Sequence, residues 1–222
     1  APHEQWSGAG RSMSARSSGR IHQQTMTVHG QEWTVYGVEG TPAQVVQHAL
    51  LEILPERPAL VVCGINYGEN VGSGITVSGT VGAALEAVSY GPRVLAVSLE
   101  TPQAYYQSYS NEIDFSAAAH FTQLFARKLL ANALPFDVDV LKVDVPASAT
   151  PQTEWRITRV SRHPYYLPVP PARARLQDPH PMGFRPVVAL EELETDSDIY
   201  ALRVQKIVSV TPISLDLTSR VE

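Results

Sequence analysis

Cysteine is nearly absent from this chain of 222 residues, which contains one, Cys63. A single thiol cannot form an intramolecular disulfide, nor can it supply a zinc cluster built on cysteine. No Asn-x-Ser/Thr glycosylation sequon occurs either. Together these absences favour a reducing, cytoplasmic setting.

Long hydrophobic runs and an excess of basic residues are also lacking. No apolar stretch approaches the roughly 20 residues that a bilayer-spanning helix needs, so the sequence predicts no membrane span. The chain has 17 Lys and Arg against 22 Asp and Glu, a formal net charge of -5. Because binders of nucleic-acid polymers neutralise phosphates with basic surfaces, this balance disfavours such a partner.

Several common catalytic motifs are missing. There is no Gly-Lys pair and hence no Walker A loop, and there is no Gly-x-Gly-x-x-Gly, Gly-x-Ser-x-Gly or His-Glu-x-x-His motif. The seven histidines show no metal-ligand spacing. If a metal binds, oxygen ligands and a hard cation such as Mg²⁺ or Mn²⁺ are therefore favoured.

The apolar pattern alternates between helical and strand spacing. It predicts a β-hairpin at 25–38, and helices at 41–54, 78–91 and 114–133. Strands are predicted at 59–63, 94–98 and 138–145. The first helix has a capping box formed by Thr41 and Gln44, with Pro42 at its first position. The run at 59–63 is typical of a central parallel strand, whereas polar residues alternate in 138–145 and indicate one wetter side. We predict a three-layer α/β/α Rossmann-like core over residues 1–150.

The chain changes character after Pro146. Segments 155–160 and 200–210 are β-prone, and seven of the 17 prolines lie between Pro164 and Pro186. Such a stretch cannot form a central strand or a long helix. We predict that residues 151–222 form a β-rich extension whose arm or long hairpin mediates oligomerisation. A long surface loop on a monomer is the alternative.

A glycine-rich segment at 64–74 follows the predicted strand 59–63. In open α/β sheets, ligands bind at the carboxyl ends of strands. The amides of Asn66 and Asn70 could coordinate a metal or bind a substrate hydroxyl there. The alternative is a glycine-rich turn in which both asparagines have only a conformational role.

The residues Ser78, Gly79 and Thr80 begin the second predicted helix. The first N–H groups of a helix are unpaired and carry partial positive charge, which suits an anion such as phosphate. Ordinary N-capping by Ser78 explains the same residues, and spacing alone does not separate the two interpretations.

These segments resemble the SurE family, which comprises metal-dependent 5'-nucleotidases and phosphatases of nucleoside monophosphates. The resemblance is carried by 58–72, 78–86 and 94–99, and is supported by matches at Ala1-Pro2, Ser7-Gly8, Gly40-Thr41-Pro42, 114–118, 143–146, 209–212 and 216–218. It covers nearly the whole chain in the family's order. A SurE-like fold and homodimers or homotetramers formed through carboxyl-terminal arms are implied.

The resemblance also implies a site. A divalent cation, Mg²⁺ or Mn²⁺, would be held by Ser7 and Asn66, and the phosphate would lie at Ser78, Gly79 and Thr80 with Asn70 nearby. In the family an adjacent aspartate pair completes the metal site; its motif lies upstream of the segment that matches Ala1-Pro2. The first strand of the core and the catalytic residues are therefore expected upstream of Ala1. Two smaller departures are His3, where an acidic residue is common, and Gln44, where Asp is frequent.

Two main hypotheses follow. The first is a metal-dependent phosphate monoester hydrolase that acts on nucleoside 5'-monophosphates, represented here by an amino-terminally shortened chain. The second is a catalytically impaired SurE-like binding or scaffold protein, motivated by the missing aspartate pair. A third, a phosphate-binding α/β enzyme of unrelated chemistry, remains if the resemblance is set aside.

Overall fold

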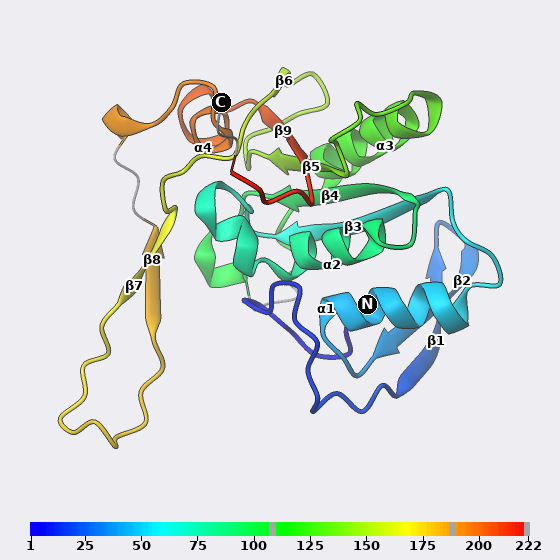
Figure 1. The fold of residues 1–222 in the computed structure, drawn as a ribbon, viewed down its shortest axis with the longest axis horizontal. Helices are drawn as coiled ribbons and strands as arrows, with labels where there is room; N and C mark the ends of the chain where they lie inside the picture. The colour runs from blue at the N-terminus through cyan, green and yellow to red at the C-terminus, as the bar shows by residue number, and fades with distance from the viewer. Residues whose placement is uncertain (107–109, 187–189, 220–222) are drawn as a thin grey trace.

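A five-stranded sheet forms the centre of the computed structural model, which describes residues 1–106, 110–186 and 190–219 (Figure 1). The strand order is β3-β4-β5-β9-β6. β3, β4 and β5 are parallel, β9 is antiparallel to β5, and β6 is parallel to β9. The strands comprise β3 (Leu60–Tyr67), β4 (Arg93–Leu99), β5 (Val140–Val145), β6 (Trp155–Ile157) and β9 (Val208–Ile213).

Helices cover both faces of this sheet. α3 (Ser116–Ala131) packs on one face, where Phe121, Phe125 and Leu129 are buried against β4 and β5. α2 (Gly79–Val88) covers the opposite face, and α1 (Pro42–His48) packs against α2 (Figure 1). The predicted three-layer α/β/α architecture is therefore confirmed. Among the described residues, no helix is long and apolar enough to cross a bilayer.

Two local predictions near the amino end are confirmed. β1 (Ile21–Val28) and β2 (Gln31–Val38) form an antiparallel hairpin. At the start of α1, the Thr41 hydroxyl accepts the N–H of Gln44, and the Gln44 side chain accepts the N–H of Thr41. The helix continues as a π-helical turn at Ala49–Ile53.

One prediction about the strands is wrong. β3, predicted as a central strand, is the outermost of the five described strands, and Val62 is 41% exposed; the strand that the family resemblance places upstream of Ala1 is not part of this chain, so the sheet does not test that prediction. β5 was expected to have one wet side, but all six of its residues are buried. Its alternating polar residues, Lys142 and Asp144, pair with each other inside the protein.

Residues beyond 150 contribute to the core as well as to an arm. β6 and β9 extend the main sheet, so the sheet takes strands from both sides of the predicted boundary at residue 150. β7 (Tyr166–Val169) and β8 (Gly183–Pro186) form the predicted proline-rich hairpin, which projects from the body of the molecule (Figure 1).

The predicted strand at 200–210 is wrong in its first half. α4 (Asp198–Tyr200), capped by the Ser197 hydroxyl, leads into a π-helical turn at Ala201–Gln205. Short 3₁₀ turns occur at Gly72–Val77, Gln103–Tyr105 and Leu190–Glu192.

Candidate functional site

The carboxyl ends of β3, β4 and β5 meet at Asn70. Its backbone N–H donates to Asp144 Oδ1 on β5 at 2.8 Å, and its side-chain Nδ2 donates to Ser98 Oγ on β4 at 2.7 Å. The carbonyl oxygen of Asn70 accepts from Lys142 Nζ on β5 at 2.8 Å. Asn70 is therefore fixed at three atoms by the ends of two neighbouring strands. We call residues 68–72 the Asn70 loop.

Lys142, Asp144 and Asp198 form a buried ionic triad beneath this loop; all three are 0% exposed. Lys142 Nζ donates to Asp144 Oδ2, and to Asp198 Oδ2 at 3.2 Å. Asp198 also accepts the N–H of Ser161 and the N–H of Gly72. Burial alone would lower the pKa of Lys142, but the two carboxylates outweigh it and raise the pKa above its ordinary value. The ammonium form is therefore favoured.

Asn66 is the second-last residue of β3, just before the Asn70 loop. Its Nδ2 donates to the carbonyl oxygens of Tyr67 at 3.1 Å and Gly68 at 2.8 Å. Both amide hydrogens are thereby used, and the side chain is oriented by its own loop. The carbonyl oxygen Oδ1 has no hydrogen-bond donor within the described part of the chain, and so is the atom available to a ligand.

Ser7 lies on an exposed turn that runs between this loop and the start of α2. Gln5 Nε2 donates to Ser7 Oγ at 3.1 Å and to the carbonyl oxygen of Tyr106 at 2.6 Å. The Tyr106 ring packs on Gly68, where a Cβ atom would lie 2.7 Å from it. On the other side, a Cβ atom at Gly79 would lie 3.2 Å from the Trp6 carbonyl oxygen. The Ser7 turn is thus in contact with the first turn of α2 through Trp6, and is connected to the loop after β3 through Gln5 and Tyr106.

The start of α2 has the geometry expected of either a plain cap or an anion site. Ser78 is buried, and its hydroxyl accepts the N–H of Val81 at 3.2 Å. N-capping by Ser78 is therefore present. The N–H groups of Gly79 and Thr80 have no acceptor among the described residues, as is usual at a helix start. These two donors remain for an anion.

A second group of polar residues connects the Asn70 loop to the hairpin arm. Glu69 is only 7% exposed, and its carboxylate accepts from Tyr166 Oη at 3.0 Å and Tyr106 Oη at 3.3 Å. The two hydroxyl oxygens are themselves 2.5 Å apart. Burial, reinforced by the charge of Glu69, raises the pKa of both phenols. They therefore stay protonated and act as donors.

Sequence reasoning missed both polar groups. The alternation of Lys142 with Asp144 is a usable signal, because residues two apart share one face of a strand. It was interpreted as a wet face, since two charges two residues apart can either meet solvent or pair with each other. No local pattern identifies Asp198, Tyr106 or Tyr166, because each meets its partner only in the folded chain.

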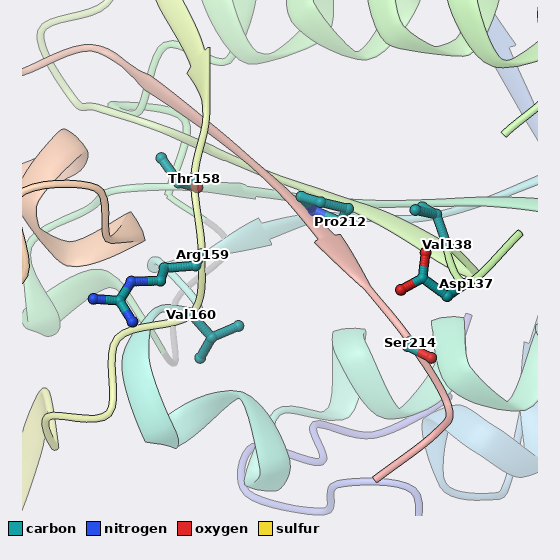
Figure 2. A pocket seen from close by; sticks show the side chains of 7 residues that line it. All are labelled: Asp137, Val138, Thr158, Arg159, Val160, Pro212 and Ser214. Carbon is teal, nitrogen blue, oxygen red and sulfur yellow. The ribbon is translucent and has the colours of Figure 1, made fainter. Parts of the chain in front are cut away.

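The structure also has a concavity of about 370 Å³ away from these residues, beside β6 and the end of β9 (Figure 2). One acidic and one basic side chain line it, and the basic one, Arg159, forms an ion pair with Asp196 at 2.7 Å. We assign it no function, because it lacks a convergent set of reactive groups. Its lining consists of Asp137, Val138, Thr158, Arg159, Val160, Pro212 and Ser214.

Comparison with known proteins identifies the family. The family described as Survival protein SurE matches residues 1–166. The chain is also 42% identical over 187 residues to a 5'-nucleotidase SurE of Thermococcus kodakarensis, covering 83% of this chain and 70% of that protein. The chain belongs to the SurE family. A second 5'-nucleotidase SurE, from Archaeoglobus fulgidus, is 39% identical over 225 residues, covering 100% of this chain and 82% of that protein.

A solved SurE structure has the same fold. The crystal structure of the SurE protein from Aquifex aeolicus matches with a TM-score of 0.69 and 26% identity, covering 96% of this chain and 80% of the other. The match extends beyond the region of the family model. The carboxyl-terminal part of this chain is therefore arranged as in a SurE protein as well.

The donor atoms of Ser7 and Asn66 are of the chemical type that binds the divalent metal implied by this family. Ser7 offers a hydroxyl oxygen and Asn66 an amide oxygen, both suited to a hard divalent cation. In the described ranges, however, no group of three or more His, Cys, Asp or Glu residues could hold a metal ion. These residues therefore provide two neutral ligands, and tight binding needs carboxylates beyond this pair.

Proposed function

We propose that this protein is a metal-dependent phosphate monoester hydrolase that acts on nucleoside 5'-monophosphates. The observation that carries the proposal is the similarity to proteins named 5'-nucleotidase SurE, at 42% and 39% identity over most of the chain. It is supported by the convergence of the Ser7 turn, the Asn70 loop and the start of α2 at the carboxyl ends of parallel strands.

We assign separate tasks to the residues at this place. The N–H groups of Gly79 and Thr80, with the Thr80 hydroxyl, would bind phosphate oxygens and stabilise negative charge at the helix start. Ser78 maintains that helix start by capping it. Asn70, held by the sheet, would bind the substrate. Asn66 Oδ1 and Ser7 Oγ would hold Mg²⁺ or Mn²⁺, which when bound neutralises phosphoryl oxygens and lowers the pKa of a water.

The test is hydrolysis of AMP by the protein as its gene encodes it, with and without added Mn²⁺ or Mg²⁺. We expect metal-stimulated release of phosphate, and a loss of about a hundredfold or more in Asn66→Ala. Even residues that only orient metal ligands are worth roughly 10–100-fold. Asn132→Ala, an exposed asparagine at the end of α3, is the matched control and should keep full activity.

Full activity in Asn66→Ala would refute the site assignment. If the unsubstituted protein shows no metal-stimulated hydrolysis of any nucleoside monophosphate, the binding or scaffold hypothesis takes the place of the enzymatic one.

We also infer a homodimer or homotetramer held together by the β7–β8 hairpin. Four apolar side chains in the described part of the arm are exposed, with Val169 at 37%, Leu176 at 86%, Met182 at 51% and Phe184 at 55%. Apolar side chains gathered on a projecting arm favour contact with another protein surface. Light scattering of the protein should give the mass of two or four chains, and Leu176→Asp should lower it. A monomer at micromolar concentration would contradict this inference.

A further inference from the structure

We propose that Lys142 is a positioning residue for the substrate site: from β5 it holds the Asn70 loop in place, directly at Asn70 and indirectly through Asp144 and Asp198. The inference rests on the proposed function, which assigns substrate binding to Asn70. It adds a role for a buried triad that is not itself exposed to substrate.

The hydrogen-bond inventory excludes direct contact between Lys142 and a phosphate. An ammonium group has three N–H donors. Those of Lys142 have three acceptors, the Asn70 carbonyl oxygen, Asp144 Oδ2 and Asp198 Oδ2. The side chain is 1% exposed. Lys142 therefore has no donor left for a ligand and can act on the site only through these neighbours.

The triad holds the loop from both sides of the Asn70 peptide and again two residues later. Lys142 Nζ donates a hydrogen bond to the Asn70 carbonyl oxygen, and Asp144 Oδ1 accepts one from the Asn70 N–H at 2.8 Å. Asp198 Oδ2 accepts the N–H of Gly72 at 3.1 Å. Since Asp144 is on β5 and Asp198 begins α4, Lys142 joins the two carboxylates that fix consecutive parts of one loop.

The energetics of buried ions favour a positional role over one in stability alone. Removing charges from water costs nearly as much as their attraction returns, so a buried ion pair gives little net stability. Hydrogen bonds from fixed charges do, however, restrict the backbone they hold, and a binding group gains affinity when its conformation is fixed beforehand. Loss of the triad should therefore weaken substrate binding more than it slows the chemical step.

The test uses the gene-encoded protein and the double substitution Lys142→Met with Asp144→Asn, which removes one positive and one negative charge together and so leaves the net charge of the triad at -1. Asp198 loses its ammonium partner but keeps the N–H donors of Gly72, Ser161 and Ile199. The amide oxygen that Asp144→Asn leaves in place can still accept the Asn70 N–H, so the change tests the contacts that Lys142 makes with Asn70 and Asp198. The matched control is Thr211→Val. Thr211 is fully buried and directly opposite Lys142 on β9, but it hydrogen-bonds to Thr158 and Ser209 instead of to the loop.

Two measurements decide the matter. We expect KM for AMP to rise roughly tenfold with kcat changed less than about threefold, the size of one charge-assisted hydrogen bond. We also expect the amide hydrogens of residues 68–72 to exchange faster by about tenfold or more, because a released loop opens more often. Thr211→Val should change neither quantity.

Each other result overturns the inference. Unchanged KM with faster exchange means that the triad is only structural, and unchanged exchange means that Lys142 does not hold the loop. If the double variant does not fold, Asp144→Asn alone is measured. It should shift both quantities in the same direction by roughly threefold, as expected for a weakened but retained contact, and no shift again refutes the role.

Failure of the proposed function gives a different pattern. Absence of AMP hydrolysis in the unsubstituted protein refutes that function by itself. Binding of inorganic phosphate, measured by calorimetry, then replaces KM. Weaker phosphate binding with faster exchange in the double variant supports the inference, whereas no phosphate binding by the unsubstituted protein overturns it.

Discussion

Tyr166→Phe should loosen the connection between the hairpin arm and the Asn70 loop. The substitution removes one hydroxyl, which lies 3.0 Å from Glu69 Oε1 and 2.5 Å from Tyr106 Oη, and whose single hydrogen is shared between these two acceptors. A hydrogen bond to a charged group contributes roughly 1.5–3 kcal/mol. Tyr106 still donates to the other oxygen of Glu69, so we expect the lower end, about 1.5 kcal/mol. For a chain of this size, that corresponds to a fall in Tm of roughly 3–6 °C.

Thermal and urea unfolding of Tyr166→Phe, Glu69→Gln and the double variant form a double-mutant cycle. If the hydroxyl acts through Glu69, its removal in the Glu69→Gln background should cost only about 0.5 kcal/mol, the range of a weak neutral hydrogen bond. Tyr36→Phe is the control, because the Tyr36 hydroxyl has no partner among the described residues. Strict additivity of the two substitutions would refute the proposed contact.

Three further predictions concern separate parts of the fold. Burial raises the pKa of the Cys63 thiol to about 12, so a thiol reagent at pH 8 should label it only after unfolding; rapid labelling of folded protein would contradict this. Thr41→Ala removes the cap of α1 and a hydroxyl that donates to the Ser12 carbonyl at 2.6 Å, and urea unfolding should show a loss of about 1–2 kcal/mol. Although burial acts to raise the pKa of Glu194, hydrogen bonds led by that from Ser161 lower it overall, so its contribution to stability is present above pH 4.5 and is lost as the pH falls. In Glu194→Gln, the free energy of unfolding should therefore fall less steeply below pH 4.5 than in the unsubstituted protein. The same steepness in both proteins would refute this.

The parts of the fold that were predictable are those with a local cause. The capping box at Thr41 and Gln44 fixes the start of α1 within four residues of sequence, and the apolar stripe of α3 shows its buried face directly. The proline-rich hairpin follows from the exclusion of proline from helices and central strands. Each of these features depends on neighbours close in the chain.

The errors come from features that depend on distant partners. An apolar strand indicates burial but not its place in a sheet, so the run at 59–63 alone could not give the position of β3, which is the outermost of the five described strands. Lys142 and Asp144 looked solvent-facing because their further partners are distant in the chain: Asp198 is 56 residues from Lys142, and Asn70 is 74 residues from Asp144. The π-helical turn at Ala201–Gln205 was interpreted as strand because its apolar residues suit either structure, and the Ser197 cap that begins the preceding helix lies outside the segment.

The candidate site also contains residues that could be predicted from the sequence and residues that could not. Ser78, Gly79 and Thr80 were predicted at a helix start, and the structure has them there. Family resemblance brought Ser7 and Asn66 into consideration, whereas their residue types alone carry little information. The loop's anchors on β4, β5 and α4 could not be predicted, because a hydrogen bond between segments more than 25 residues apart has no signature in either segment.

The most direct measurement is a crystal structure of the gene-encoded protein with Mn²⁺ and inorganic phosphate. We expect phosphate oxygens within hydrogen-bond distance of the N–H groups of Gly79 and Thr80, and the metal bound to Asn66 Oδ1 and Ser7 Oγ. Phosphate and metal bound elsewhere, or apolar side chains filling the space between Asn66 and the start of α2, would contradict the proposed site.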